Sequence, residues 1–144
     1  MRAMLQGLAF VTLIWATLSG AARGADLIVI GEWRTEAKKS LVCGGEEGAT
    51  LVDIAQRANA FYQSGGRSGS PEYDAYWSVL EKAMQERRCF VTEQMRHLPD
   101  EIVYEGPEEL DKLNKRFKVL GTTIEENGNK YPAFTMTTHA VRRQ

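Results

Sequence analysis

The chain has 144 residues, of which 43% are hydrophobic and 26% are charged, and its formal net charge is −1. This length fits one small domain and excludes a large multidomain enzyme. The weakly acidic balance gives no electrostatic reason for nucleic-acid binding, and the apolar content is too high for a disordered chain. We therefore expect a small globular protein without a nucleic-acid partner.

The beginning of the chain has the pattern of an export signal. Arg2 precedes an apolar stretch, Leu8–Leu18, and small residues follow it up to Ala25. Signal peptidase removes such segments, and we place the mature start near Ala25. An uncleaved membrane anchor is the alternative, but the apolar core is shorter than the roughly 20 residues that a spanning helix needs. The sequence thus predicts residues 1–24 as a signal peptide and residues 25–144 as a single exported domain, periplasmic or extracellular, with no membrane span after cleavage.

Two cysteines, Cys43 and Cys89, follow the predicted signal, and exported proteins tend to pair their cysteines. A reactive thiol pair is one alternative, yet neither cysteine has a C-x-x-C spacing or a flanking histidine. A zinc site formed with His97 and His139 is another, although it needs reduced cysteines in an oxidising compartment. We expect a structural disulfide, no metal and no cofactor.

Two amphipathic helices are predicted between the cysteines. The first begins within Glu46–Thr50 and ends before Ser64, because apolar residues recur there with a helical period. Its apolar positions are Leu51, Ile54, Ala55, Ala58, Phe61 and Tyr62, and its other faces carry Asp53, Gln56, Arg57 and Asn59. The second begins with Ser70 as N-cap and Pro71 in the first turn. Its apolar stripe is Tyr73, Tyr76, Trp77, Leu80 and Met84. A Gly/Ser-rich connector joins the two, which predicts an antiparallel helical hairpin within about residues 46–88.

Extended segments are predicted on both sides of this hairpin. A short strand near Leu27–Ile30 precedes it, and a strand-rich part of about residues 89–141 follows it. The strands predicted in that part are Cys89–Thr92, Glu101–Glu105, Phe117–Ile124 and Lys130–Thr137.

Local signals separate these strands. Leu98–Asp100 predicts a turn, and Pro107–Asn114 predicts one or two helical turns or an exposed loop. Asn127–Gly128 supplies the positive φ angles of a tight hairpin turn. Pro132 favours a sheet edge or a bulge, because it has no N–H for a ladder. Thr137–Val141 is interpreted as a single helical turn.

The succession of four strands, a short turn and a terminal Val141 resembles the bacterial SH3-like small β-barrel. The resemblance covers residues 89–141. The chain lacks the Gly-Trp pair near the last strand of that family and has Tyr131–Phe134 in its place, so no binding residue is carried over. Exported SH3-like domains bind peptides or cell-wall fragments, and the resemblance therefore implies a binding role. The predicted fold class is α+β, an N-terminal helical hairpin followed by a small antiparallel sheet or an SH3-like partial barrel.

No sequence motif indicates catalysis. His97 and His139 stand 42 residues apart without metal-ligand spacing. We interpret His97 as a surface turn residue and His139 as an exposed terminal one. Ser68 lacks the G-x-S-x-G spacing of a hydrolase nucleophile, and no glycine pattern matches a phosphate-binding loop. We assign no catalytic or metal-binding residue and leave the binding residues unknown.

Three other features have both structural and functional interpretations. The aromatic residues of the two helices form either a core, which their helical spacing favours, or a ligand shelf. Trp33 either closes the core or is an exposed interaction point. Arg87-Arg88 and Arg142-Arg143 are interpreted as solvated ends, with a shared anion-binding patch as the alternative.

These observations predict an exported, non-enzymatic binding or interaction protein. Its partner would be a protein or a cell-wall peptide, so that a cell-wall binder and an inhibitor or immunity-type protein are equally reasonable. The alternative is a small secreted hydrolase, whose carboxylates and histidine come together only in the folded chain.

Overall fold

The computed structural model describes residues 27–142, so the predicted signal peptide and its cleavage point lie outside the described residues. The strands are β1 (Ile28–Val29), β2 (Arg34–Thr35), β3 (Ser40–Gly44), β4 (Cys89–Thr92), β5 (Arg96–Tyr104), β6 (Lys118–Glu126), β7 (Asn129–Thr137) and β8 (Ala140–Val141). The helices are α2 (Gly48–Gln63), α3 (Pro71–Gln85) and the 3-10 helix η1 (Glu108–Leu113). Among these described helices, none has the length and apolar character needed to cross a membrane.

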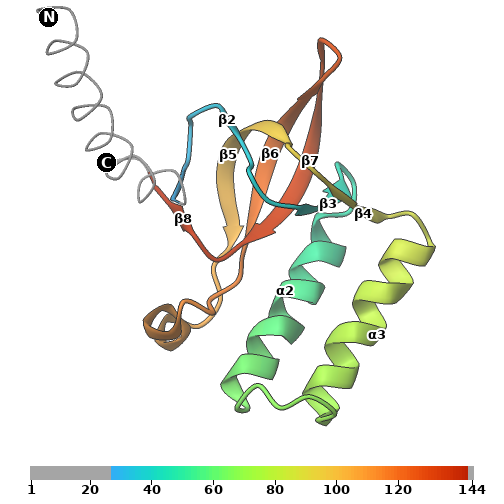
Figure 1. Cartoon of the computed structure of the whole chain (residues 1–144), viewed down its shortest axis with the longest axis vertical. Coiled ribbons are helices and arrows are strands. Elements are labelled where there is room, and N and C mark those ends of the chain that lie inside the picture. Colours follow the sequence, from blue (N-terminus) through green and yellow to red (C-terminus); the bar gives the residue numbers. More distant parts are fainter. Residues whose placement is uncertain (1–26, 143–144) are drawn as a thin grey trace, which may run out of the picture.

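Six strands form one antiparallel sheet in the order β2-β5-β6-β7-β3-β4. A separate parallel pair, β1 and β8, places Ile28 opposite Ala140. The helices α2 and α3 lie side by side beneath the sheet (Figure 1). Helix α2 contacts β3, β6 and β7, whereas α3 packs mainly on α2 and contacts the sheet at β4.

The predicted fold class is wrong in its arrangement, because the helical hairpin is not N-terminal to the sheet. β2 and β3 precede the helices and belong to the same sheet as the later strands. The hairpin is therefore an insertion between two neighbouring strands, β3 and β4 (Figure 1). The local signal for β3 is weak, since only Leu41–Cys43 is apolar between two lysines and two glycines. β3 forms because it pairs with β4 on one side and with the distant β7 on the other.

The connection between β2 and β3 forces the sheet to curl. Only residues 36–39 join these strands, although they stand four places apart in the sheet. A flat sheet would separate them by about 19 Å, whereas five extended residues reach about 17 Å. The Glu36 N–H donates a hydrogen bond to the carbonyl of Met95, the residue before β5, at 2.8 Å. Glu36 is therefore held next to β5, and fewer residues remain to span the distance to β3. The sheet curls accordingly, and Met95 packs with Val42 of β3 in one apolar cluster.

The main core lies between the helices and the sheet. Its buried residues are Cys43, Leu51, Ile54, Ala55, Leu80, Ala83, Cys89 and Val119. The opposite, concave face holds a second cluster around Val42, Met95, Ile124 and Ala133. The pair of β1 and β8 contributes Ile28 and Ala140 to a third cluster with Leu120.

Asn59 is buried, although the sequence pattern places it on a polar face of α2. Its Nδ2 donates to the Phe117 carbonyl at 3.0 Å and to the Tyr104 hydroxyl at 3.2 Å. Its Oδ1 accepts from the Phe117 N–H at 2.8 Å. The buried amide thus ties α2 to the start of β6, and these bonds offset the cost of its burial.

Several local predictions are confirmed. The helices begin and end close to the predicted positions, and the Ser70 hydroxyl accepts from the Tyr73 N–H at 3.2 Å ahead of Pro71. The β6–β7 turn has positive φ angles at Asn127 and Gly128, 53° and 80°. β4 has the predicted bounds, and Pro107–Asn114, predicted as helical turns or an exposed loop, contains the 3-10 helix η1.

Two predictions depend on prolines that lie in strands, Pro132 in β7 and Pro99 in β5. The pairing of β7 with β3 ends at Ala133, so Pro132 lies where β7 has only β6 beside it, as predicted. The predicted turn at Leu98–Asp100 is wrong, because these residues lie inside β5. A register shift after Pro99 shows a bulge, which accommodates a residue without an N–H.

The predicted helical turn over Thr137–Val141 is also wrong. Residues 140–141 form β8, which pairs with β1, a strand more than 100 positions earlier in the sequence. Strands of two residues have too little sequence to show a period, so their local pattern predicts nothing of this pairing.

The predicted disulfide is confirmed. Cys43 and Cys89 stand directly opposite each other in β3 and β4, with Cα atoms 4.0 Å apart, and their sulfurs are bonded. Both residues are buried in the main core. The bridge closes the chain at the base of the inserted hairpin, and it leaves neither cysteine as the free thiol that the reactive-pair and zinc alternatives require.

We predict that replacing both cysteines by serine lowers the free energy of unfolding by roughly 4 kcal/mol, because the bridge closes a span of 46 residues. Urea unfolding of the double variant and of the oxidised protein measures the difference. Mass determination with and without reductant should show the gain of two protons on reduction. Equal masses, or unchanged unfolding of the double variant, would contradict the structural role.

Candidate functional site

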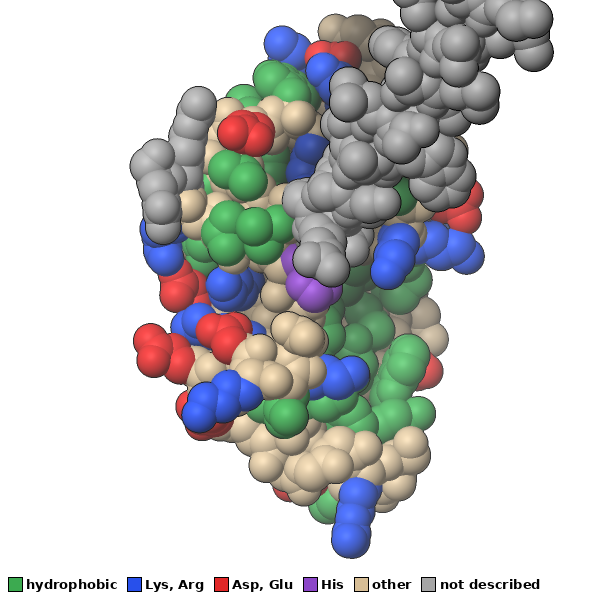
Figure 2. Space-filling model, turned by 60° about the vertical axis from the view of Figure 1, so that its left-hand side comes forward, with side chains coloured by type: hydrophobic (Ala, Val, Ile, Leu, Met, Phe, Trp, Pro, Cys, Tyr) green, Lys and Arg blue, Asp and Glu red, His purple; other side chains and the backbone are tan. Residues whose placement is uncertain are grey.

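The candidate site is a hollow of about 430 Å³ at a gap in the sheet, between β3 and β7. Residues 34–40 line one side and residues 135–139 line the other, with Ile28, Met95 and Phe117 completing it. We call it the β3–β7 slot. Figure 2 shows a face of the molecule on which a histidine side chain lies beside a hollow with hydrophobic walls, with lysine and arginine side chains around it.

The slot exists because β3 and β7 pair over only three residues each. Their register joins Val42 to Thr135 and would next bring Leu41 opposite Met136, but the pairing stops there. The Thr135 hydroxyl donates to the Leu41 carbonyl at 2.8 Å, so a side chain takes the acceptor at the end of the ladder. Beyond this point the chain before β3 leads back to β2, while β7 continues toward β8. The two backbones therefore diverge.

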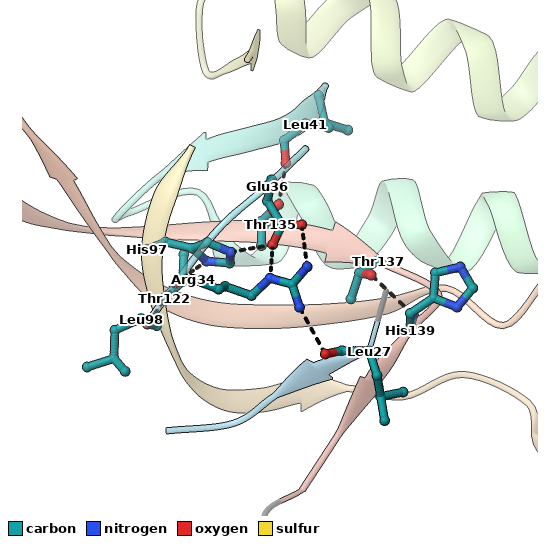
Figure 3. A network of polar contacts seen from close by, with 10 residues as sticks. All are labelled: Leu27, Arg34, Glu36, Leu41, His97, Leu98, Thr122, Thr135, Thr137 and His139. Carbon is teal, nitrogen blue, oxygen red and sulfur yellow. Dashed lines mark hydrogen bonds and ion pairs between the residues drawn. The ribbon is translucent and has the colours of Figure 1, made fainter. Parts of the chain in front are cut away.

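Glu36 is the central polar residue of the slot, and its side chain is only 15% exposed. Arg34 binds both of its oxygens, with Nε 2.7 Å from Oε2 and Nη2 donating to Oε1 at 3.0 Å. The His97 Nε2 lies 2.7 Å from Oε2 (Figure 3). Arg34 also donates to the Leu27 carbonyl at 2.9 Å. Glu36 thus joins the link between β2 and β3 to β5.

His97 is fully buried in β5, so its prediction as a surface turn residue is wrong. Its Nδ1 lies 2.7 Å from the Thr122 hydroxyl, which donates its own proton to the Leu98 carbonyl at 2.8 Å. Because that proton is already engaged, the hydroxyl accepts from Nδ1–H. Its Nε2 lies within hydrogen-bond distance of Glu36. Both ring nitrogens thus have partners inside the protein, and neither is free for a substrate.

The pKa of Glu36 reflects opposing influences. Burial raises it, but the hydrogen bond from His97 and the charge of Arg34 together outweigh burial and hold the pKa below its ordinary value of 4.5. Glu36 is therefore ionised at neutral pH. Since Arg34 and His97 occupy its oxygens, it is a poor general base.

His139 is exposed, as predicted, and it lines the slot. Figure 3 shows its ring pointing away from the Glu36 network. Its backbone N–H donates to the Thr137 hydroxyl at 3.1 Å. Within residues 27–142, no three His, Cys, Asp or Glu side chains gather as metal ligands.

The slot carries an excess of positive charge. Lys38 and Lys39 lie on its rim, while the negative charge of Glu36 is balanced by Arg34. Lys39 lies 3.8 Å from Glu93, with both side chains 71% exposed, so this surface pair is weak. Cationic groups, threonine hydroxyls and apolar walls together suit an anionic group on an extended chain. The sequence shows the two lysines but not the gap beside them.

Trp33 is half-buried, so it is neither the fully buried core residue nor the fully exposed interaction point that the sequence allows. The Arg96 guanidinium lies 5.3 Å and the Lys130 ammonium 5.2 Å from its ring. Both cations already occupy positions near the indole, which makes a structural role the simpler one.

The arginine pairs do not form a shared patch among the described residues. Arg88 donates to the Thr50 hydroxyl at 3.0 Å near the start of α2. Arg142 pairs with Glu105 after β5, and Arg143 lies outside the described residues.

The aromatic residues of the helices are neither a closed core nor a free shelf. Phe61, Tyr62, Tyr73 and Tyr76 are partly buried and in ring contact, while Trp77 is 41% exposed. The row of rings thus begins inside the hairpin and ends at its surface.

No family model matches the chain, and no curated protein or solved structure is significantly similar to it.

We predict that Glu36→Gln lowers the free energy of unfolding by about 2 kcal/mol near neutral pH, because it removes charge-assisted bonds to Arg34 and His97. The lowered folded pKa means that this stabilisation is fully present above about pH 4.5 and is lost as the pH falls through the folded pKa. Urea unfolding of both proteins at several pH values checks this. The difference should shrink in acid, and a difference independent of pH would contradict it. Glu93→Gln, at an exposed site, is the control.

Proposed function

We propose that this protein is an exported, non-enzymatic binding protein, and that its β3–β7 slot receives an extended acidic segment of a partner protein or a cell-wall peptide. The observation that carries the proposal is the gap between β3 and β7, bordered by Lys38, Lys39 and His139. Its volume of about 430 Å³ falls within the range of small ligand sites.

The geometry favours an extended ligand. Beyond Thr135 the β3 side of β7 has no paired strand among the described residues, and an added peptide strand can use such an edge. The lysines on the opposite rim supply charge for acidic side chains or a terminal carboxylate. Electrostatic complementarity of this kind contributes mainly to specificity and association rate.

A binding role agrees better with the polar residues than hydrolysis does. A general base must reach the proton that it removes, but His97 is fully buried and Glu36 is held by two partners.

Export rests on the N-terminal sequence pattern and on the disulfide, which is typical of oxidising compartments. The resemblance of residues 89–141 to SH3-like barrels also implies peptide binding. A partner enzyme that is inhibited in this way is a special case of the same proposal.

We predict that the protein binds a peptide of alternating Glu and Thr more tightly than its Lys-Thr counterpart. Replacing Lys38 and Lys39 by Glu should weaken binding of the Glu-Thr peptide by about tenfold, because two attractions become repulsions. Isothermal titration at low and high salt measures both effects, and added salt should reduce the affinity.

The matched control reverses two exposed charges elsewhere, Arg67→Glu and Lys112→Glu, and should retain the affinity. Equal binding of the two peptides, or equal loss in the slot and control variants, would refute the slot as the site.

A further inference from the structure

We propose that the outward face of α3 is a second docking surface, which takes a basic amphipathic segment of a partner protein with a Lys or Arg side chain over Trp77. We call this surface the α3 face and define it by Asp74, Trp77, Glu81 and Met84. It lies on a different element from the β3–β7 slot and carries the opposite charge. The two surfaces therefore do not share any residue.

Trp77 is held in position from within the protein. Its ring centroid lies 6.1 Å from that of Tyr73 and 5.6 Å from that of Tyr76. Tyr73 in turn contacts Phe61 of α2 at 5.6 Å, and Tyr76 packs against the main core. The indole is thus supported on its inner side while 41% of the residue is exposed. A preorganised aromatic group loses little freedom on binding, which is typical of the residues that dominate interface energies.

Helix geometry places two carboxylates beside the indole. Residues three and four positions from Trp77 are its neighbours on the helix surface. Tyr73 and Leu80 are the neighbours on the inner side, whereas Asp74 and Glu81 are exposed. Neither carboxylate is in an ion pair with any of the described residues, and the one basic residue of α3, Lys82, lies 4.0 Å from Glu86 instead.

This combination selects for a cation. The face of an indole ring attracts Lys and Arg side chains, and flanking carboxylates add to the attraction. A neutral apolar partner would instead have to desolvate both carboxylates without compensation. Met84, one more turn along and 39% exposed, offers an apolar contact on the same stripe. The segment that fits is therefore basic with interspersed apolar residues, in the manner of an amphipathic helix in contact with a helix face.

The probe for this surface is a 15-residue peptide of Lys and Leu at helical spacing, titrated calorimetrically into the purified protein. We expect Trp77→Ala to weaken binding about fivefold or more, with Trp77→Phe in between, because Phe is the weaker cation–π partner. The pair Asp74→Asn and Glu81→Gln, which keeps the side-chain shapes, should weaken binding similarly and reduce its salt dependence.

The matched control neutralises two exposed acids elsewhere, Glu46→Gln and Glu108→Gln, and should leave the affinity unchanged. Circular dichroism checks that each variant is folded. A Gln-Leu peptide that binds as tightly as the Lys-Leu peptide would overturn the proposal in favour of purely apolar docking. Unchanged binding by a folded Trp77→Ala variant, or equal losses in the test and control pairs, would also overturn it.

Discussion

The short link from β2 to β3 is the constraint on which the rest of this structure depends. Because residues 36–39 must span strands that stand four places apart, the sheet curls and encloses a small concave core. The same link turns β3 away from β7 and opens the slot. Glu36 lies at the start of the link, where Arg34 and His97 bind it. One carboxylate therefore anchors the chain segment that shapes both the core and the candidate site.

A charged group in this position is costly unless it is paired, so the network specifies geometry as well as adding stability. His97 faces two partners at once, Glu36 on the link and Thr122 on β6, and Thr122 continues to the Leu98 carbonyl. This network explains how a histidine and a carboxylate meet at 2.7 Å inside the fold, where they connect the link to β5.

Local sequence signals predict the helices and turns of this fold better than they predict which strands pair and which polar residues are buried. The helices, the Ser70 cap and the Asn127–Gly128 turn follow from period and turn chemistry within a few residues. The disulfide follows from a count that permits one pairing. β2, β3 and β8 are too short to show a period and depend on partners far along the chain. The burial of Asn59 and His97 likewise depends on distant partners, so neither the slot nor the Glu36 network is visible in the sequence.

The bridge between Cys43 and Cys89 makes residues 43–89 a covalently closed ring that contains the whole helical hairpin. The hairpin is thus attached to the sheet as a loop with one sealed base. A protease that cuts once in the exposed Ser64–Ser70 connector would leave two polypeptides held together by sulfur, with β3 and β4 still paired. The connector between the helices can therefore be cut while the curled sheet and its slot keep their covalent connection to both helices.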